Sequence, residues 1–412
     1  MTPAARLQMT IEILEGLGQT AQPADRFLKA WFRSRRFAGS KDRRAIAQQV
    51  FAVQRRRAHF AHRMASDSPR ALVIASLLDS AEDPALLFTG GYGPAPLNDA
   101  ERAAIAATPS PAPDWVKGEY PSWLEEELRR AFGDGLLEEM TAFIGRAPTD
   151  IRVNTCKATR DDVIAALNGE GIACGPTPYA PNGVRITGDA THLSKSALFE
   201  SGAFEFQDEA AQIAAQLCGA RPGMRVLDLA AGAGGKSLAF AAGMDNQGEI
   251  LACDVRGEAL FELERRAARA GATIIKTSIL SEGALDQGRG QFDAVFVDAP
   301  CSGSGTWRRQ PELRWRLTAE RLSELMSLQD QLLDQAADLV RPGGRLVYAT
   351  CSILGCENQD RVAGFQARQP GFQPLNLAQN WPGILPGLGQ DFRASPAKTG
   401  TDGFYCAGFS RG

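Results

Sequence analysis

Residues 292–305 read FDAVFVDAPCSGSG, a short apolar run followed by an acid, a cysteine and a loop of small residues. The run is rich in β-branched and aromatic residues, as expected for a strand buried on both faces of a parallel sheet. Ligands of open α/β sheets bind beyond the carboxyl ends of the strands, so we expect Asp298 and Cys301 to lie where a substrate would bind. Because a free cysteine is often a small core residue, a plain turn with a buried Cys301 is the competing interpretation.

Strand-like and helix-like segments alternate regularly around this stretch. Predicted strands cover 225–229, 249–254, 273–277 and 345–350, and predicted helices begin at 236, 258 and 319. This alternation predicts a doubly wound, Rossmann-like α/β domain over residues 208–412. A small α/β subdomain is expected over 146–207. Residues 1–145 read as an all-α domain, with helix-start signals at Ser68, Asn98 and Ser122.

Composition narrows the class of protein. The chain has 412 residues, of which 44% are hydrophobic and 23% are charged, as in ordinary globular proteins. The N-terminal stretch has no secretory apolar core, and no apolar run is long enough to span a bilayer, so a cytoplasmic protein without membrane association is predicted. Eight cysteines without CxxC pairs and only three histidines favour neither a zinc site nor a disulfide framework. No metal is therefore expected, and a monomer is the predicted state.

Two basic stretches indicate a polyanion partner. Residues 26–63 carry twelve Lys or Arg against a single acid, although the whole chain has a net charge of −3. Such a segment predicts binding to RNA or DNA, with an ordinary solvated helix face as the alternative. Residues 307–317, WRRQPELRWRL, interleave arginines with Trp307 and Trp315. A single-stranded RNA site uses this combination, but so does a helix with two core tryptophans.

Residues 226–237, VLDLAAGAGGKS, run from a strand through a Gly-rich turn into a helix, which is typical of a nucleotide-type ligand site. A nucleoside triphosphate requires GxxxxGK[ST], and Ala230 stands where the first Gly belongs. A dinucleotide requires GxGxxG, and Ser237 stands in its last place. S-adenosylmethionine suits the loop best, because Asp254 ends the next predicted strand and can accept both ribose hydroxyls. ATP and NAD remain the competing ligands.

A second cysteine strengthens the chemical interpretation. Residues 345–352, RLVYATCS, form a predicted strand that ends in Cys351. Two strands of one sheet would then each present a cysteine at the carboxyl end. C5 of a pyrimidine is a poor nucleophile, and attack of a thiolate on C6 makes C5 carbanion-like and able to take a methyl group. A base must then remove the C5 proton so that the thiol can leave.

The combination of DLAAGAGGKS, DAPCSGSG and YATCS resembles the RsmB/Sun/Nop2-type RNA cytosine-5 methyltransferases, in their bacterial rRNA branch. The segments RVNTCKATRDDV, GAFEFQDEAAQ and TDGFYCAGFSR extend the resemblance to about residues 150–412. The stretch GSKDRRAIAQQVFAVQRR is similar to the NusB-like, RNA-binding domain of that branch. The resemblance implies a Rossmann-like domain that forms 5-methylcytosine in RNA and takes part in rRNA processing.

The resemblance also implies roles for individual residues. Cys351 would attack C6, Cys301 would assist product release, and Asp298 would hydrogen-bond the flipped cytosine near N3. Asp254 would bind the ribose of S-adenosylmethionine, and Ser278 and Asp298 would also lie at the cofactor. The methionine end would be held by Ala230, Ala231, Gly232, Ala233, Gly234, Gly235 and Lys236. A thiolate at neutral pH requires nearby positive charge, for which Lys236 is the candidate.

Three alternatives remain open from the residues. The family commonly has Pro where this chain has Ala233, and commonly ends the third strand in Asp where this chain offers Ser278. A noncatalytic RNA-binding or ribosome-assembly factor of the same fold is therefore one alternative. The same chemistry on tRNA is another. In DNA cytosine-5 enzymes the cysteine after the Pro of the acid loop attacks, which would exchange the roles of Cys301 and Cys351.

Overall fold

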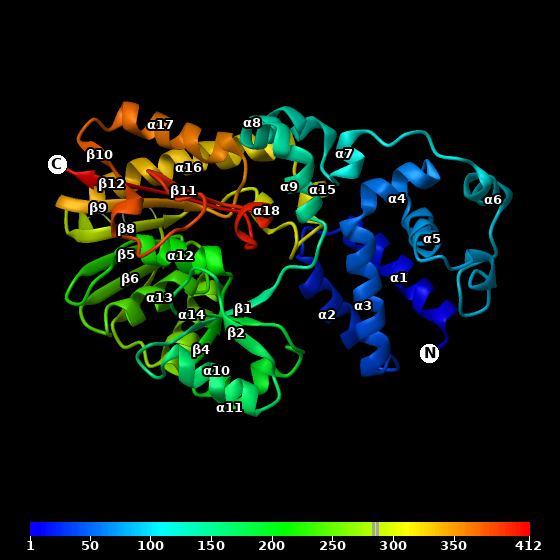
Figure 1. Ribbon diagram of the computed structural model, residues 1–412, viewed down its shortest axis with the longest axis horizontal. Coiled ribbons are helices and arrows are strands. Elements are labelled where there is room, and N and C mark those ends of the chain that lie inside the picture. Colours follow the sequence, from blue (N-terminus) through cyan, green and yellow to red (C-terminus); the bar gives the residue numbers. More distant parts are fainter. Residues whose placement is uncertain (282–284, 286–287) are drawn as a thin grey trace. The chain divides into compact units, whose positions relative to one another are not determined.

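The computed structural model describes residues 1–281, 285 and 288–412 (Figure 1). The chain forms two compact units. The first consists of Met1–Arg146 and Trp307–Arg316, and the second consists of Ala147–Thr306 and Leu317–Gly412. The chain therefore leaves the second unit after Thr306, contributes ten residues to the first unit, and returns at Leu317.

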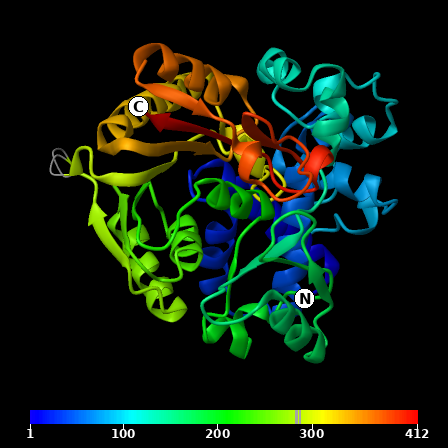
Figure 2. The ribbon, with the colours of Figure 1, turned by 60° about the vertical axis from the view of Figure 1, so that its left-hand side comes forward.

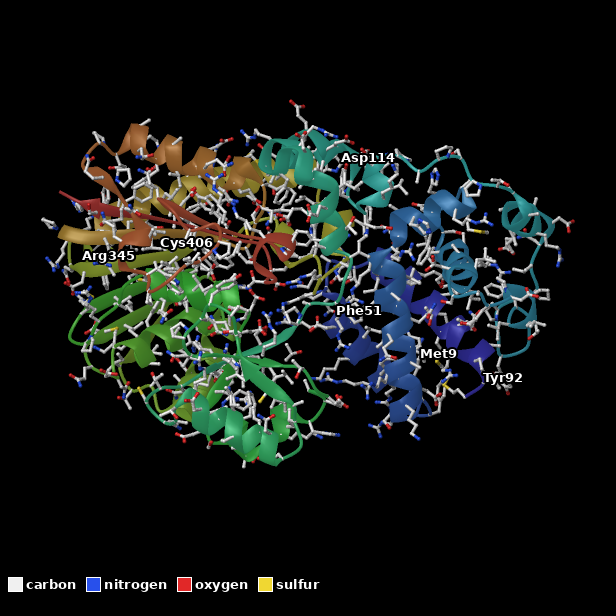
Figure 3. The ribbon with its side chains drawn as sticks, in the orientation of Figure 1. Met9, Phe51, Tyr92, Asp114, Arg345 and Cys406 are labelled. Atoms are coloured by element: carbon white, nitrogen blue, oxygen red, sulfur yellow. The ribbon has the colours of Figure 1, made fainter. Side chains whose placement is uncertain are left out.

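The first unit is helical. Its helices are α1 (Pro3–Gly18), α2 (Ala24–Arg33), α3 (Ser40–Arg55), α4 (Arg57–Met64), α5 (Pro69–Asp79), α6 (Asp99–Ala106), α7 (Asp114–Lys117), α8 (Glu125–Phe132), α9 (Leu136–Ala142) and α15 (Leu313–Arg316). The predicted start signals are confirmed at α5, where Ser68 caps the helix, and at α6, where Asn98 and Glu101 form a capping box. Apolar residues of α1, α3 and α5 form the core, with Met9 on α1 and Phe51 on α3 labelled in Figure 3.

The second unit begins with a small subdomain. It contains β1 (Thr149–Val153), α10 (Arg160–Gly169), β2 (Cys174–Pro176), β3 (Gly183–Ile186), α11 (Ala197–Glu200) and β4 (Phe204–Phe206). The strands form an antiparallel sheet in the order β2-β3-β1-β4. This βαββαβ order is ferredoxin-like. Ile151, Val184 and Phe204 are fully buried in its own core.

The larger sheet is the doubly wound sheet that was predicted. Its strands are β5 (Arg225–Leu229), β6 (Glu249–Asp254), β7 (Ile275–Ile279), β8 (Phe292–Asp298), β9 (Val340–Thr350), β10 (Phe372–Leu375), β11 (Asp391–Ala394) and β12 (Phe404–Arg411). The order is β10-β12-β9-β8-β5-β6-β7, with β11 paired to β12. Strands β5 to β9 are parallel, and β12 runs antiparallel to β9. The order reverses between β5 and β8, where the crevice of such sheets lies.

Helices cover both faces of this sheet. One face carries α12 (Glu209–Leu217), α13 (Gly235–Gly243) and α14 (Gly257–Ala270). The opposite face carries α16 (Ala319–Leu339) and α17 (Gln359–Arg368). These two helices, in yellow to orange, lie together on one side of the sheet in both ribbon views (Figures 1 and 2). The apolar residues form separate clusters on the two faces of the sheet, and α18 (Pro396–Thr399) precedes β12.

Two predicted strands differ in length or position. The strand expected at 345–350 begins at Val340, because Val340 already pairs with Phe292 before the register shifts at the intervening RPGG turn. The strand expected at 273–277 covers 275–279 instead, where its backbone pairs with β6. In both cases pairing to a neighbouring strand, rather than local propensity, determines the bounds.

Candidate active site

The two cysteines meet at the carboxyl ends of β8 and β9. These strands are parallel neighbours, with Asp298 paired in register to Ala349, so the segments that follow them leave the sheet side by side. The Sγ atoms of Cys301 and Cys351 lie 3.4 Å apart. The Gly305 amide donates to the Cys351 carbonyl at 2.9 Å, which joins the two loops. Sequence analysis predicted that these thiols share one edge of the sheet, but not that they are in contact.

Lys236 and Asp298 form an ion pair beside the cysteines. The Lys236 Nζ atom lies 2.5 Å from Asp298 Oδ2, and both side chains are largely buried. Burial alone would lower the pKa of Lys236, but the Asp298 carboxylate and Cys351 more than offset this and raise it. The lysine is therefore a fixed positive charge that acts on both Asp298 and Cys351.

Cys301 differs from its neighbour in its electrostatics. Its contact with the Cys351 thiol, together with burial and the Glu357 carboxylate, raises the pKa of Cys301 well above the ordinary value. The arrangement favours a neutral thiol at Cys301, and either sulfur can be the donor in the 3.4 Å contact.

The predicted cofactor loop has the backbone of a ligand cradle. Ala230, Gly232 and Gly234 have φ angles of 65°, 57° and 79°, so the loop is left-handed at three positions, one of them occupied by a non-glycine residue. A Cβ at Gly234 would lie 2.4 Å from the Leu263 side chain. The loop therefore requires glycine for close packing against α14, as a Gly-rich turn before a ligand-binding helix does.

Asp254 at the end of β6 faces this loop. Its carboxylate accepts from the Gly232 amide at 2.8 Å and from the Arg256 guanidinium at 3.0 and 3.1 Å. Burial would raise the pKa of Asp254, but the hydrogen bonds from Arg256 and Gly232 lower it below its ordinary value. Asp254 is thus an ionised acceptor next to the loop, and it fits a ribose diol.

The remaining predicted cofactor residues surround these two features. Ala231, Ala233, Gly235 and Lys236 continue the loop into α13, and all are partly buried. Ser278 lies on β7, paired with Cys253 and one residue before the partner of Asp254. It is therefore at the same edge of the sheet as Asp254. The structure joins Cys301 to Cys351, Lys236 to Asp298 and Asp254 to the Gly-rich loop, and it places Ser278 at the same sheet edge as Asp254.

Two further groups at the site have no role assigned from the sequence. Asp228, at the end of β5, is completely buried and accepts from the Ser237 hydroxyl at 2.5 Å, and its Oδ1 atom has no partner among the described residues. Glu357, in a 3₁₀ turn (Gly355–Glu357) after β9, is buried among serines of both cysteine loops. The run of Ser302, Ser304 and Ser352 beside the two cysteines was the available signal for the second group.

One predicted RNA-contact segment is wrong in its placement. Within the helical unit, Trp307 and Arg314 are fully buried, and Trp315 and Arg316 are partly buried. Arg314 donates to the Glu119 carbonyl at 2.7 Å and to the Phe143 carbonyl at 3.3 Å. Arg314 and Arg316 thus satisfy backbone carbonyls of the helical unit, where they are not available to phosphates.

The basic segment 26–63, unlike 307–317, has several basic side chains exposed to solvent. Its exposed basic residues are Arg26, Lys29, Arg33, Arg36, Lys41 and Arg44. Three of them, Arg26, Lys29 and Arg33, lie on α2 at spacings that place them on one face of the helix. Phe37, just after α2, is 69% exposed.

Comparison with solved structures defines the class. The chain superposes on the crystal structure of PH0851 with a TM-score of 0.79 and 28% identity, covering 100% of this chain and 99% of the other. It superposes on a methyltransferase homolog protein from Pyrococcus horikoshii with a TM-score of 0.63 and 26% identity, covering 72% and 97%. The fold is that of the S-adenosylmethionine-dependent methyltransferases.

Sequence comparison defines the family. Residues 215–410 match the 16S rRNA methyltransferase RsmB/F family, and residues 120–191 match the ferredoxin-like domain of RsmF/B-like methyltransferases. Over these residues the chain belongs to the RsmB/F methyltransferase family. The probable ribosomal RNA small subunit methyltransferase B of Synechocystis is 34% identical over 60% of this chain and 56% of its own length. The alignments with the first curated relatives span between 56% and 65% of the relatives' length.

Among residues 1–281, 285 and 288–412, no helix is both long and apolar enough to cross a bilayer.

Proposed function

We propose that the protein transfers a methyl group from S-adenosylmethionine to C5 of a cytosine in ribosomal RNA, through a covalent adduct between Cys351 and C6. The observation that carries the proposal is the pair of thiols 3.4 Å apart at the ends of β8 and β9, beside the Lys236–Asp298 ion pair. The choice of rRNA is supported by relatives named ribosomal RNA small subunit methyltransferase B.

The residues at the loop fit S-adenosylmethionine, which when bound supplies an electrophilic methyl group on a sulfonium. The left-handed backbone from Ala230 to Gly234 would lie against the methionine end, and the Asp254 carboxylate would accept from the ribose hydroxyls. Arg256, which now bonds Asp254, is largely exposed and can move aside.

The Cys351 sulfur begins the chemistry. Attack of its thiolate on C6 forms an S–C6 bond and moves the C5–C6 π electrons to C5, which then takes the methyl group. Reactive cysteines commonly have a cation nearby, and Lys236 is near enough to Cys351 to interact with it electrostatically. Removal of the C5 proton by a base re-forms the C5–C6 double bond and breaks the S–C6 bond.

Asp298 positions the base. Its carboxylate is oriented by Lys236 and lies at the end of β8, where it can bond the cytosine edge near N3. Such a bond would orient the base, and a proton shared between N3 and this carboxyl would stabilise the negative charge that flows into the ring when the thiolate adds. The cytosine must leave its stack to reach this point.

Cys301 assists release. As a thiol with a raised pKa, it donates a hydrogen bond to the sulfur of Cys351 and so stabilises the departing thiolate. This assignment makes Cys351 the nucleophile and Cys301 the helper, and the exchanged roles are the alternative that the experiment below distinguishes. The exposed basic face of α2 is proposed as an RNA-docking surface of the helical unit.

The decisive experiment follows the two cysteines separately. Wild type, Cys301→Ala and Cys351→Ala are incubated with unmodified rRNA and labelled S-adenosylmethionine, and protein–RNA adducts are resolved on a denaturing gel. We expect label transfer by wild type, an adduct that accumulates in Cys301→Ala because release is slow, and neither product in Cys351→Ala.

Each other result has a defined meaning. Accumulation in Cys351→Ala alone would exchange the two roles. Transfer to tRNA but not to rRNA would change the substrate class. Binding of S-adenosylmethionine and RNA without transfer or adduct would point to a noncatalytic RNA-binding factor. Cys218→Ala, which removes a buried thiol outside the site, serves as the control for loss of a cysteine.

A further inference from the structure

One carboxylate joins the two cysteine loops. Glu357 is fully buried, and its oxygens accept four hydrogen bonds. Oε1 accepts from the Ser302 amide at 2.8 Å and from the Gln329 side chain at 3.0 Å. Oε2 accepts from the hydroxyls of Ser302 and Ser352, each at 2.5 Å. Ser302 directly follows Cys301 and Ser352 directly follows Cys351, so each loop is held to the same side chain one residue from its thiol.

Neighbouring side chains close the network. The Ser304 hydroxyl lies 3.1 Å from that of Ser302 and 3.0 Å from that of Ser352, and it accepts from the Ile353 amide. Asn358 accepts from the Thr350 hydroxyl at 2.6 Å and donates to the Ser352 carbonyl at 2.9 Å. A buried hydrogen-bond network of this kind fixes the groups that form it, provided that every member is satisfied.

We propose that Glu357 is a positioning residue that holds the two cysteine loops together and thereby sets the distance between the Cys301 and Cys351 sulfurs. The consequence for methyl transfer rests on the proposed function, whereas the consequence for thiol geometry does not. Glu357 has no hydrogen bond to either sulfur among the described residues, so it positions the thiols through the loops, and its charge adds only the electrostatic effect on Cys301 described above.

The chemistry of a carboxylate explains why this residue type is suited to the position. A buried charge is costly unless each lone pair is used, and here two oxygens meet two hydroxyls, one amide N–H and one side-chain amide. Glutamine has the same reach, because its oxygen can keep the Ser302 amide and its NH₂ can donate to serine hydroxyls that rotate. Aspartate keeps the charge but is one methylene shorter, so it cannot bridge both loops.

The test measures thiol proximity without RNA. Dibromobimane, which becomes fluorescent when it bridges two nearby thiols, is added to wild type and to Glu357→Gln, Glu357→Asp and Glu357→Ala, with Cys301→Ala giving the background. We expect Glu357→Gln to bridge within about threefold of the wild-type rate and Glu357→Asp to be slower by about tenfold or more, because small displacements have large effects on proximity reactions.

The variants separate position from charge. If Glu357 acted through its charge on Cys301, Glu357→Asp would resemble wild type and Glu357→Gln would not, and the proposal would be overturned. Equal rates in all folded variants would overturn it too. Glu209→Gln is the matched control, since Glu209 is also fully buried in this unit and accepts from the Tyr179 and Ala180 amides outside the site. Far-UV circular dichroism verifies folding, and the Gln–Asp comparison suffices if Glu357→Ala does not fold.

A second arm addresses catalysis. Single-turnover adduct formation on rRNA should slow by about 100-fold in Glu357→Asp, as expected for a misplacement of about 1 Å, with unchanged affinity for S-adenosylmethionine. If wild type forms no adduct, the proposed function fails and the bridging result still decides the role of Glu357. If bridging slows but adduct formation does not, the positioning role does not extend to the reaction.

Discussion

Asp228 shows what burial at a single residue does to this site. It lies at the end of β5 beneath the cofactor loop, and burial, with a contribution from the Asp298 charge, raises its pKa to about 7, although the Ser237 hydroxyl opposes the shift. The folded protein therefore holds a proton at this carboxyl that the unfolded chain releases near pH 4.

The sign of the pH dependence follows. Because the folded pKa is raised, the neutral form contributes its full stability below pH 4, and that contribution falls as the pH rises towards 7 and is level above it. The change amounts to roughly 4 kcal/mol in the free energy of unfolding. Asp228→Asn cannot titrate, so urea unfolding of the variant relative to wild type should diverge by that amount between pH 4 and pH 8. Parallel curves for the two proteins would contradict the buried, protonated Asp228.

Other residues of the site differ in how far the sequence predicts them. Asp298, Cys301 and Cys351 follow strands, and a parallel sheet places strand ends together whatever the loops do. The bridging position of Glu357 cannot be predicted from the positions of the strands, because it depends on which serine hydroxyls the folded loops direct at its carboxylate. The contact between the two thiols likewise depends on the geometry of the loops, and no periodic pattern in the sequence predicts it.

At the level of elements, helix α15 and the residues before it form part of the helical core. The Trp307 ring packs edge-on against Phe143 at 6.1 Å between centroids, and the buried Arg314 guanidinium bonds carbonyls of Glu119 and Phe143. Burial lowers the pKa of Arg314 to about 10, so it remains charged at neutral pH. A run of Arg and Trp has the same composition in a core as on an RNA-binding face, and only the tertiary contacts distinguish them.

Substitution of Arg314 should therefore loosen the helical unit. Arg314→Ala leaves buried carbonyls without donors, at a cost of roughly 3 kcal/mol. Since a chain of two units need not unfold in one step, the measurement is amide hydrogen exchange in 114–146, which should become faster there. Arg102→Ala, which removes an exposed arginine of the same unit, should leave exchange unchanged. Unchanged exchange in Arg314→Ala would contradict the core role of the segment.

At the level of the whole molecule, the proposed RNA-docking face and the proposed active site belong to different units. The exposed basic face of α2 belongs to the helical unit, whereas the thiols and the cofactor loop belong to the other. Combining Arg26→Gln, Lys29→Gln and Arg33→Gln should weaken RNA binding similarly for all sequences. It should also lower the slope of log affinity against log salt by about 2 to 3, since each lost phosphate contact removes about 0.7 to 0.9.

The matched control changes equal charge elsewhere in the same unit. Arg102→Gln, Lys117→Gln and Arg129→Gln together remove three exposed positive charges from α6, α7 and α8. Filter binding of rRNA over a range of salt concentrations compares the two triple variants. Equal salt slopes would show that net charge, and not the α2 face, governs binding.

The fold class was predictable from the sequence because the alternation of strands and helices is long and regular. The contribution of residues 307–316 to the helical unit was not predictable, because no local pattern marks it.

The contribution of residues 307–316 to the helical unit has a consequence for how the chain can be divided. The polypeptide crosses between its two units at three points, after Arg146, Thr306 and Arg316. A chain that starts at residue 147 would therefore lack the helices around Trp307 and Arg314 while retaining these two residues, and would expose an apolar ring and an unsatisfied cation. Removal of the helical unit without exposing these groups therefore requires a second change, at residues 307–316.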